Sequence, residues 1–432
     1  MRRNIIHPGA KELTYEIREI VTTAKKIEKI GQKMTWENIG DPLTAGETLP
    51  QWLKNIVQEE TKDDASYAYC PTKGVLATRE YIVDERKKDG VNLSVEDILF
   101  FNGLGDAIAT TYFYIEKHAR VIGPDPAYPA HSSAESARAG DKHITYKLDP
   151  ENNWIPDLED LENKIKFNDS IVGLLLINPG NPVSVVYSKE ILEKIISLVK
   201  KYDLFIISDE VYANLAHEPE NFTPLYKILG DVPALIMKGL SKEIPWPGSR
   251  CGWIEFYNRD KDENFNEFSE SIMNAKMLEV CATTLPQRAL PTILQSPGYA
   301  GYTKSRIEKY KKRANFAFNI FSSNNSLLAP KPTGAFYYTV VFKKGLLNNL
   351  QKLNIENSEI LNIVEEETSK NISLDKRFVY YLLGATGIVT VPLSGFHSEE
   401  LGFRITLLQE DEEKFEWIIN TINKKINEYL ES

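Results

Sequence analysis

The 432-residue sequence has few cysteines and no long hydrophobic run. Its three cysteines, Cys70, Cys251 and Cys281, are widely separated and odd in number, so they offer neither a disulfide framework nor a cysteine-rich metal site. The apolar run from Ile171 to Ile177 has seven residues, whereas a membrane-spanning helix needs about 20. Met1-Arg2-Arg3 is not followed by an apolar stretch, so we expect no secretory signal. These absences predict a cytoplasmic protein with no membrane segment and no metal site.

Positive charge is also in short supply. Lysine and arginine total 51 and aspartate and glutamate total 61, which gives a net charge of −10. Mild acidity over a chain this long favours solubility and argues against a nucleic-acid-binding surface. Hydrophobic residues make up 42% and charged residues 26%, close to globular averages, so disordered and fibrous classes are excluded. We therefore expect a folded enzyme of two closely joined domains.

Short apolar runs alternate with helical patterns through the middle of the chain. Strands are predicted at residues 98–101, 119–122, 144–148, 171–177, 204–207, 234–237 and 252–256. Between two of these strands, residues 188–202 place their apolar side chains on one helical face. This alternation predicts an α/β fold in which helices cover both sides of a mostly parallel central sheet.

The two ends of the chain have a different pattern. Leu13, Ile17, Ile20, Ala24 and Ile27 recur at helical spacing and predict an amphipathic helix, with Gly31 just beyond its end. After residue 301, a charged helix over 302–321 precedes strands at 335–342, 388–391 and 403–407, and a last helix with an acidic first turn at 410–413. We predict a large domain over 53–305 and a smaller α+β domain formed by 1–52 and 306–432.

Polar or turn-forming residues directly follow four of the predicted strands. These segments are Asn102-Gly103-Leu104-Gly105, Asn178-Pro179-Gly180-Asn181-Pro182, Ser208-Asp209-Glu210-Val211-Tyr212 and Gly239-Leu240-Ser241-Lys242. In open α/β sheets, ligands bind outside the carboxyl ends of the strands. The sequence thus predicts a site that combines a glycine turn, an amide, a carboxylate, a phenol, a hydroxyl and an amine.

Two of these features have simpler interpretations when taken alone. The glycine turn is no dinucleotide fingerprint, because G-x-G-x-x-G requires glycine where Ile108 stands, and a plain strand–helix turn explains it. At a helix N-terminus it can still bind one phosphate. Lys242 alone is typical of a surface lysine. Arg250, eight residues later, can however bind a phosphate, and a neighbouring cation can make a lysine nucleophilic, as Schiff-base chemistry requires.

Ser241-Lys242 followed by Arg250-Cys251-Gly252 resembles the fold-type I pyridoxal-phosphate enzymes, specifically class I/II aminotransferases similar to aspartate aminotransferase. The resemblance extends over nearly the whole chain. It implies that Lys242 carries pyridoxal 5′-phosphate (PLP) as an imine. It also implies cofactor contacts from Gly103, Leu104, Gly105, Ser241 and Arg250 to the phosphate, from Tyr128 to the ring face, from Asp209 to the pyridine nitrogen, and from Asn181 and Tyr212 to the phenolic oxygen.

The same resemblance implies a substrate site and a partner. Phe403-Arg404-Ile405 resembles the segment whose arginine binds the substrate α-carboxylate, and Asn181 and Gly40, in Gly40-Asp41-Pro42, would line the substrate pocket. Tyr69 is similar to the tyrosine lent to the other subunit's phosphate site, which implies a homodimer. Val183-Ser184 and Pro245-Trp246-Pro247 depart from the family pattern near the site, and Gly105 and Gly239 replace hydroxyl-bearing residues, so more of the phosphate binding would depend on Arg250 and Ser241.

These residue types agree with amino-group transfer. A carboxylate beside the pyridine nitrogen keeps it protonated and makes the ring an electron sink, and the released Lys242 amine can move a proton between the substrate α-carbon and the cofactor C4′. We expect an aminotransferase that exchanges the amino group between an α-amino acid and a 2-oxo acid in a PLP/pyridoxamine-phosphate ping-pong cycle. A C–S lyase or acyl-transferring synthase of the same fold is the alternative.

A regulatory protein with an aminotransferase-like domain is a third possibility, but it would carry a basic DNA-binding module, and the sequence shows no spare basic N-terminal domain. The amino acid substrate stays open. Arg288 is a candidate cation for the distal carboxylate of a dicarboxylic substrate, and it is equally typical of an ordinary helix-surface arginine.

Overall fold

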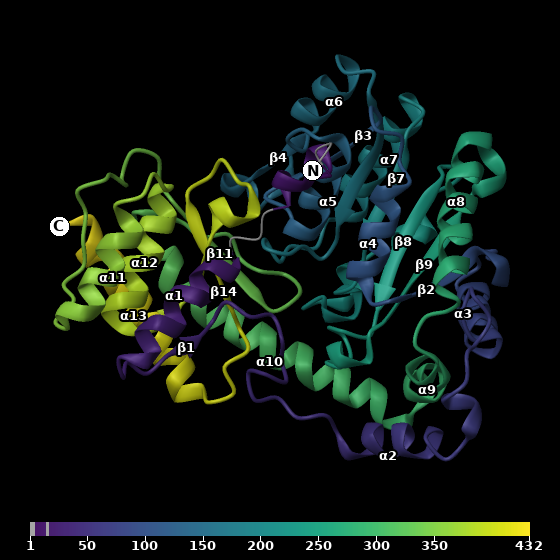
Figure 1. Ribbon diagram of the computed structural model, residues 1–432, viewed down its shortest axis with the longest axis horizontal. Coiled ribbons are helices and arrows are strands. Elements are labelled where there is room, and N and C mark those ends of the chain that lie inside the picture. The colour runs from purple at the N-terminus through teal and green to yellow at the C-terminus, as the bar shows by residue number, and fades with distance from the viewer. Residues whose placement is uncertain (1–4, 14–16) are drawn as a thin grey trace.

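An eight-stranded sheet forms the centre of the larger part of the protein in the computed structural model, which describes residues 5–13 and 17–432 (Figure 1). Its order is β2 (Ile98–Asn102), β9 (Cys251–Tyr257), β8 (Ala234–Gly239), β7 (Phe205–Asp209), β6 (Ile171–Ile177), β3 (Arg120–Asp125), β4 (Thr145–Asp149) and β5 (Ile155–Pro156). Strand β9 runs antiparallel to both of its neighbours, β5 runs antiparallel to β4, and the other pairs are parallel. The predicted mostly parallel sheet is confirmed.

Both faces of this sheet are buried, which explains why its strands are apolar without a polar alternation. In β6, Leu174 and Leu176 pack into one hydrophobic core, while Leu175 and Ile177 pack into the core on the opposite face. The covering helices are α3 (Leu76–Lys88), α4 (Leu104–Phe113), α5 (Pro129–Ala139), α6 (Leu158–Lys166), α7 (Lys189–Lys201), α8 (Glu263–Glu279) and α9 (Thr284–Gln295), with α2 (Gln51–Glu60) packed on α9.

Helix α7 shows how the local sequence determines a covering helix. The Ser188 hydroxyl caps the helix by accepting a hydrogen bond from the Ile191 backbone N–H. Leu192, Ile195 and Val199 are fully buried against the sheet, as their spacing predicts, while Ile191 and Leu198 are partly buried beside them. Among the described residues, no helix is both long and apolar enough to cross a membrane.

The smaller part of the molecule contains a four-stranded sheet and residues from both ends of the chain (Figure 1). The sheet order is β10 (Leu327–Leu328), β11 (Tyr337–Phe342), β14 (Gly402–Thr406) and β13 (Val391–Pro392), and β1 (Thr35–Trp36) pairs with β12 (Ile388–Val389) in a separate ladder. Its helices are α1 (Ile17–Lys29), α11 (Ser358–Thr368), α12 (Leu374–Thr386), α13 (Glu412–Leu430) and the later part of α10 (Pro297–Ser322).

Several predicted strands differ from the structure in their bounds, and β3 for example ends at Asp125 rather than at residue 122. Two of the differences have a clear cause in the fold. The strand expected at 388–391 is two short strands, because Val389 pairs with Trp36 in one sheet while Val391 pairs with Arg404 in another. The strand expected from residue 335 begins at Tyr337, since Ala335 has a φ of 53°, a left-handed conformation that a strand cannot contain.

The start of the N-terminal helix and the boundary between the two domains were also predicted. Helix α1 begins at Ile17; Leu13 is exposed, and residues 14–16 of the predicted first turn, like the Met1-Arg2-Arg3 segment, lie outside the described residues. The predicted domain boundary at 305/306 falls inside α10, which continues from the large sheet to the small one (Figure 1), and the boundaries stay a prediction.

Candidate active site

The predicted site residues gather at one edge of the central sheet. Gly103 follows β2, Asn181 follows β6, Asp209 ends β7, and Lys242 follows β8. These strands are parallel to one another, so their carboxyl ends share that edge. Because β9 is antiparallel, Arg250, which directly precedes it, lies at the same edge.

Lys242 is directed toward the N-terminal segment of the small part. Its Nζ donates a hydrogen bond to the carbonyl oxygen of Gly40 at 2.7 Å. The nearest other lysine in the sequence, Lys238, is instead paired with the buried Glu210 carboxylate at 2.8 Å. Of these two lysines, only Lys242 thus has its amine at the segment predicted to line the substrate pocket.

Gly103, Arg250 and the start of α4 form a corner suited to a phosphate. Gly103 has a φ of 83°, and a β-carbon at this position would lie only 2.6 Å from Arg250 Nη2. The guanidinium donates to the Asn102 carbonyl oxygen at 3.1 Å and to the Pro247 carbonyl oxygen at 3.3 Å. Arg250 is still an exposed residue, as is Gly105 in the first turn of α4. A helix N-terminus next to an arginine fits an anion, because free backbone N–H groups and a positive charge converge there.

A buried polar chain holds the Asp209 carboxylate. Its Oδ1 accepts a hydrogen bond from the Val211 N–H at 3.1 Å, and its Oδ2 lies 3.2 Å from His131 Nε2. The other ring nitrogen of His131 lies 3.4 Å from the Tyr112 hydroxyl. The ring of Tyr128 meets that of His131 edge-on at 6.5 Å, so the predicted stacking residue stands beside this chain. These contacts therefore fix the orientation of the Asp209 carboxylate.

Two tyrosine hydroxyls meet at the boundary between the two sheets. Those of Tyr212 and Tyr337 are 2.9 Å apart, and both side chains are buried. Burial raises the pKa of Tyr212 well above its usual value, and the neighbouring Tyr337 raises it further. The phenol thus stays neutral at physiological pH and can donate a hydrogen bond. A side chain at residue 40 would overlap the Tyr337 hydroxyl, which explains the glycine there.

Arg404 is held in the same place by hydrogen bonds and by contacts with the rings of Tyr337 and Phe396. It is 2% exposed on β14; Nη1 donates to Asn181 Oδ1 at 3.0 Å, and Nη2 donates to the Asn38 carbonyl oxygen at 2.5 Å. Its guanidinium also lies over the Tyr337 ring, 4.3 Å from the centroid. The structure therefore brings the predicted carboxylate-binding arginine into direct contact with Asn181, which is predicted to contact both cofactor and substrate.

Several residues of this region have no signal in the sequence. Tyr337, His131 and Asn38 belong to no motif and enter the site only through the fold. Asn38 is 1% exposed, and within residues 5–13 and 17–432 neither polar atom of its side chain has a hydrogen-bond partner. A buried amide whose polar atoms have no protein partner can donate hydrogen bonds to a polar ligand and accept them from it.

Tyr69 and Arg288 do not contact the described residues of the predicted site around Lys242, Asp209 and Arg404. Tyr69 is 83% exposed in the loop before α3. Arg288 pairs with Glu60 at 3.2 Å and with Asp63 at 2.5 Å, so it ties α9 to α2 and the segment after it. This engagement favours the interpretation of Arg288 as a structural helix-surface arginine.

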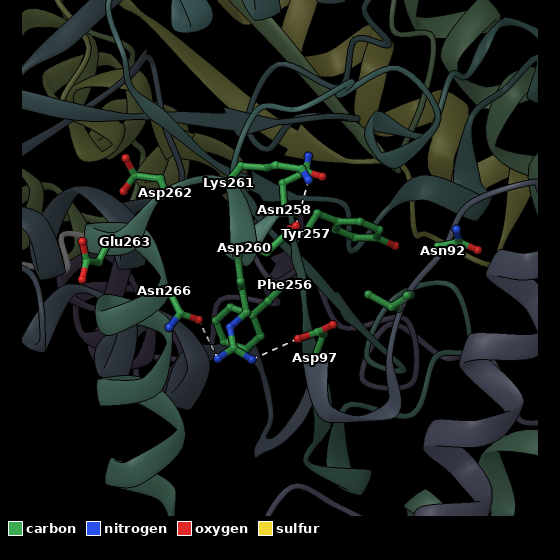
Figure 2. A pocket seen from close by; sticks show the side chains of 12 residues that line it. Asn92, Asp97, Phe256, Tyr257, Asn258, Asp260, Lys261, Asp262, Glu263 and Asn266 are labelled. Carbon is green, nitrogen blue, oxygen red and sulfur yellow. Dashed lines mark hydrogen bonds and ion pairs between the residues drawn. The ribbon is translucent and has the colours of Figure 1, made fainter.

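A separate cleft of about 800 Å³ lies at the opposite edge of the sheet, where β9 ends and β2 begins (Figure 2). Arg259 there is engaged by Asp97 at 3.0 Å and Asn266 at 2.9 Å. The lining also contains Asp260, Asp262, Glu263 and Lys261, so carboxylates outnumber cations four to two. Such a lining repels phosphates and carboxylic acids, so the cleft does not suit the predicted cofactor or substrates.

The chain is similar to known proteins over almost its whole length. Residues 32–422 match the family described as aminotransferase class I and II. A protein of Methanocaldococcus jannaschii described as an uncharacterized aminotransferase is 51% identical over 433 residues, which cover 100% of both chains. The glutamate-pyruvate aminotransferase of Escherichia coli K12 is 28% identical over 335 residues, which cover 76% of this chain and 80% of that one. The solved structure of alanine aminotransferase from Pyrococcus furiosus superposes with a TM-score of 0.84 at 26% identity, covering 99% of this chain and 100% of that one.

Proposed function

Because the chain belongs to the PLP-dependent aminotransferase class I and II family and is a transaminase, we propose that its substrates are alanine and 2-oxoglutarate, with pyruvate and glutamate as products. The observation that carries the proposal is the convergence of Lys242, Asp209 and Arg404 at one edge of the sheet. The names of the relatives from E. coli and P. furiosus support the choice of substrates. The Tyr337 hydroxyl against Gly40 supports a pocket for a small side chain.

The residues at this edge fit PLP. The positive corner of Gly103, Leu104, Gly105, Ser241 and Arg250 would hold the phosphate, Tyr128 would cover the ring, Asp209 would face the pyridine nitrogen, and Asn181 and Tyr212 would face the phenolic oxygen. The glycine cradle against Arg250 and the oriented Asp209 carboxylate support this assignment. When bound, PLP supplies a ring that withdraws electrons from the substrate α-carbon.

The chain's own residues then divide the remaining work. The Arg404 guanidinium, with Asn181 beside it, would bind and orient the substrate α-carboxylate. The Lys242 amine would remove the proton from the substrate α-carbon as a general base. Asp209 would keep the pyridine nitrogen protonated, since its carboxylate is fixed by Val211 and His131.

The function is tested by adding alanine to the PLP-loaded protein without any oxo acid. The absorbance of the bound cofactor should change once, with one pyruvate released per subunit, and 2-oxoglutarate should then restore the first spectrum while forming glutamate. Aspartate and phenylalanine should react with a kcat/KM at least about tenfold lower, the effect of about 1.4 kcal/mol. Continuous product formation from a single amino acid would instead indicate a lyase. A reaction that requires an acyl donor would indicate a synthase.

We also propose that the enzyme is a cytoplasmic homodimer, in which Tyr69 reaches the phosphate site of the other subunit. Family members are typically dimeric, and two-fold dimers are the commonest closed assembly. The 83% exposure of Tyr69 supports this role, because a large aromatic side chain on a loop then lacks cover from its own chain. The scarcity of cysteine supports the proposed cytoplasmic location.

Mixing a Tyr69→Phe chain with a Lys242→Ala chain tests the shared site. The heterodimer would have one site with both defects and one with neither, so activity should rise to as much as half that of the wild-type dimer. The measurement is the alanine–2-oxoglutarate rate after confirmed subunit exchange, with both parents clearly impaired. A rate that merely averages the two parents would mean that Tyr69 serves its own subunit.

Tyr67→Phe provides the matched control for this experiment. Tyr67 is an exposed aromatic of the same loop, but its hydroxyl donates to the Thr61 carbonyl oxygen of its own chain at 2.9 Å. A Tyr67→Phe chain should therefore be active alone, and mixing it with the Lys242→Ala chain should give no gain.

A further inference from the structure

Arg306 on α10 connects the backbone of Lys242 to the rest of the molecule. It is 2% exposed, and its Nη1 donates hydrogen bonds to the carbonyl oxygens of Lys242 at 2.9 Å and of Glu243 at 2.6 Å. Helix α10 runs from beside α9 in the larger part of the molecule to the small sheet (Figure 1). A single guanidinium on this connecting helix thus fixes the main chain at the residue predicted to carry the cofactor.

Glu47 determines the direction in which this guanidinium points. Its Oε1 accepts a hydrogen bond from Arg306 Nε at 2.6 Å, and its Oε2 accepts one from the Tyr310 hydroxyl at 2.8 Å. Burial by itself raises the pKa of Glu47, but Arg306 and then Lys309 outweigh it and hold the pKa below its usual value. The carboxylate is therefore ionised at neutral pH, and the pair keeps both of its charges.

One segment of the chain, which contains Gly40 and Glu47, is connected to both the amine and the backbone of Lys242. Glu47 follows Gly40 by seven residues in one turn-rich segment, and its N–H donates to the Pro42 carbonyl oxygen at 2.9 Å. This segment holds the Lys242 amine through Gly40 and, through Glu47 and Arg306, the Lys242 carbonyl oxygen. The backbone and the amine of Lys242 are thus both held in place by the same stretch of chain.

We infer that Arg306 and Glu47 are positioning residues that hold Lys242 at the cofactor carbon with which it bonds. The inference rests on the proposed function, because it concerns the bond between Lys242 and PLP. Only arginine suits the role, since its planar fork reaches two carbonyl oxygens and a carboxylate in fixed directions, whereas the ammonium of lysine is a point charge. Holding the amine in place raises its effective concentration at the cofactor.

A competing amine measures that effective concentration directly. Methylamine added to the PLP-loaded protein displaces Lys242: the double bond from the cofactor carbon to Nζ is replaced by a double bond to the methylamine nitrogen, and the two N–H protons of methylamine pass to Nζ, which leaves as a free amine. The concentration giving half displacement, followed by cofactor absorbance, should fall about tenfold in Arg306→Lys, because hydrogen bonds from a charged donor contribute enough free energy for this change. In Glu47→Gln, which keeps the shape but not the charge, it should fall by about threefold, as a weaker neutral hydrogen bond remains.

Arg313→Lys is the matched control. Arg313 lies seven residues later on the same helix, is equally buried, and also donates to a carbonyl oxygen, that of Leu407 at 3.0 Å, and to a carboxylate, that of Glu412 at 2.9 Å. None of these partners belongs to the segment around Lys242. The control should lose thermal stability much as Arg306→Lys does, while its methylamine midpoint should equal that of the wild type.

Each remaining outcome distinguishes the two proposals. If the wild-type protein does not bond PLP through Lys242, the proposed function fails first. If the wild type does so and the midpoint in Arg306→Lys is unchanged, Arg306 does not position Lys242 and the inference is wrong. If Arg306→Lys does not fold, the methylamine midpoint of Glu47→Gln tests the inference in its place. If neither variant folds, the pair serves the fold alone, which also overturns the inference.

Discussion

Replacing Lys242 with alanine should reduce the rate of the alanine half-reaction by at least about 10²- to 10⁴-fold, the contribution of a positioned general base. The loss follows from the location of the amine, which lies 2.7 Å from the Gly40 carbonyl oxygen at the edge where Asp209 and Arg404 also lie. Lys238, the nearest other lysine in the sequence, is not available to replace it, because its amine is bound to Glu210. Single-turnover kinetics with alanine, followed by cofactor absorbance, measure the rate.

Borohydride reduction separates loss of the lysine from loss of the fold. In the wild type, reduction should fix the cofactor irreversibly to the peptide that contains Lys242, and mapping should find no label elsewhere. The Lys242→Ala variant should still bind PLP through the phosphate corner at Arg250 but should retain none after reduction and denaturation. A label on Lys238 in the wild type would contradict the assignment of Lys242.

Arg404→Lys should weaken amino-acid binding by at least about 1.5–3 kcal/mol, the usual contribution of a hydrogen bond to a charged group. Arginine meets a carboxylate with two parallel hydrogen bonds, which lysine cannot reproduce. In this protein the guanidinium also contacts Asn181 and the Asn38 backbone and lies over the Tyr337 ring, so a lysine loses its alignment as well. Titration of alanine against the cofactor spectrum gives the Kd, while the spectrum without substrate should change little.

Arg377→Lys is a suitable comparison for that variant. Arg377 is also buried in the smaller part of the molecule, donates to the carbonyl oxygens of Thr368 and Gln351, and lies over the Tyr381 ring at 5.1 Å. Its replacement should lower the Tm without changing the Kd for alanine. Wild-type affinity in Arg404→Lys would remove Arg404 from the substrate site.

The sequence by itself determined the architecture and most of the local features of the site. Continuous apolar runs such as 171–177 specify buried strands, because only a sheet covered on both faces can bury every residue of a strand. Chain order then places residues such as Asp209 and Lys242 at one edge, since parallel strands share their carboxyl ends. The fold class and the edge that carries the site could therefore be predicted from local pattern and order, whereas the family was predicted from its resemblance at Ser241-Lys242 and Arg250.

Only the tertiary structure decided which groups hold these residues in place. Tyr337 meets Tyr212 across 125 positions of sequence, and Arg306 meets Lys242 across 64. Contacts of this kind depend on how the small sheet and α10 pack against the large sheet, and no periodicity within either segment encodes that packing. The same reason explains the strand expected at 388–391, whose two halves pair with different parts of the chain. Local sequence specifies each strand and turn, whereas the partner of a buried polar group is fixed only when distant elements come together.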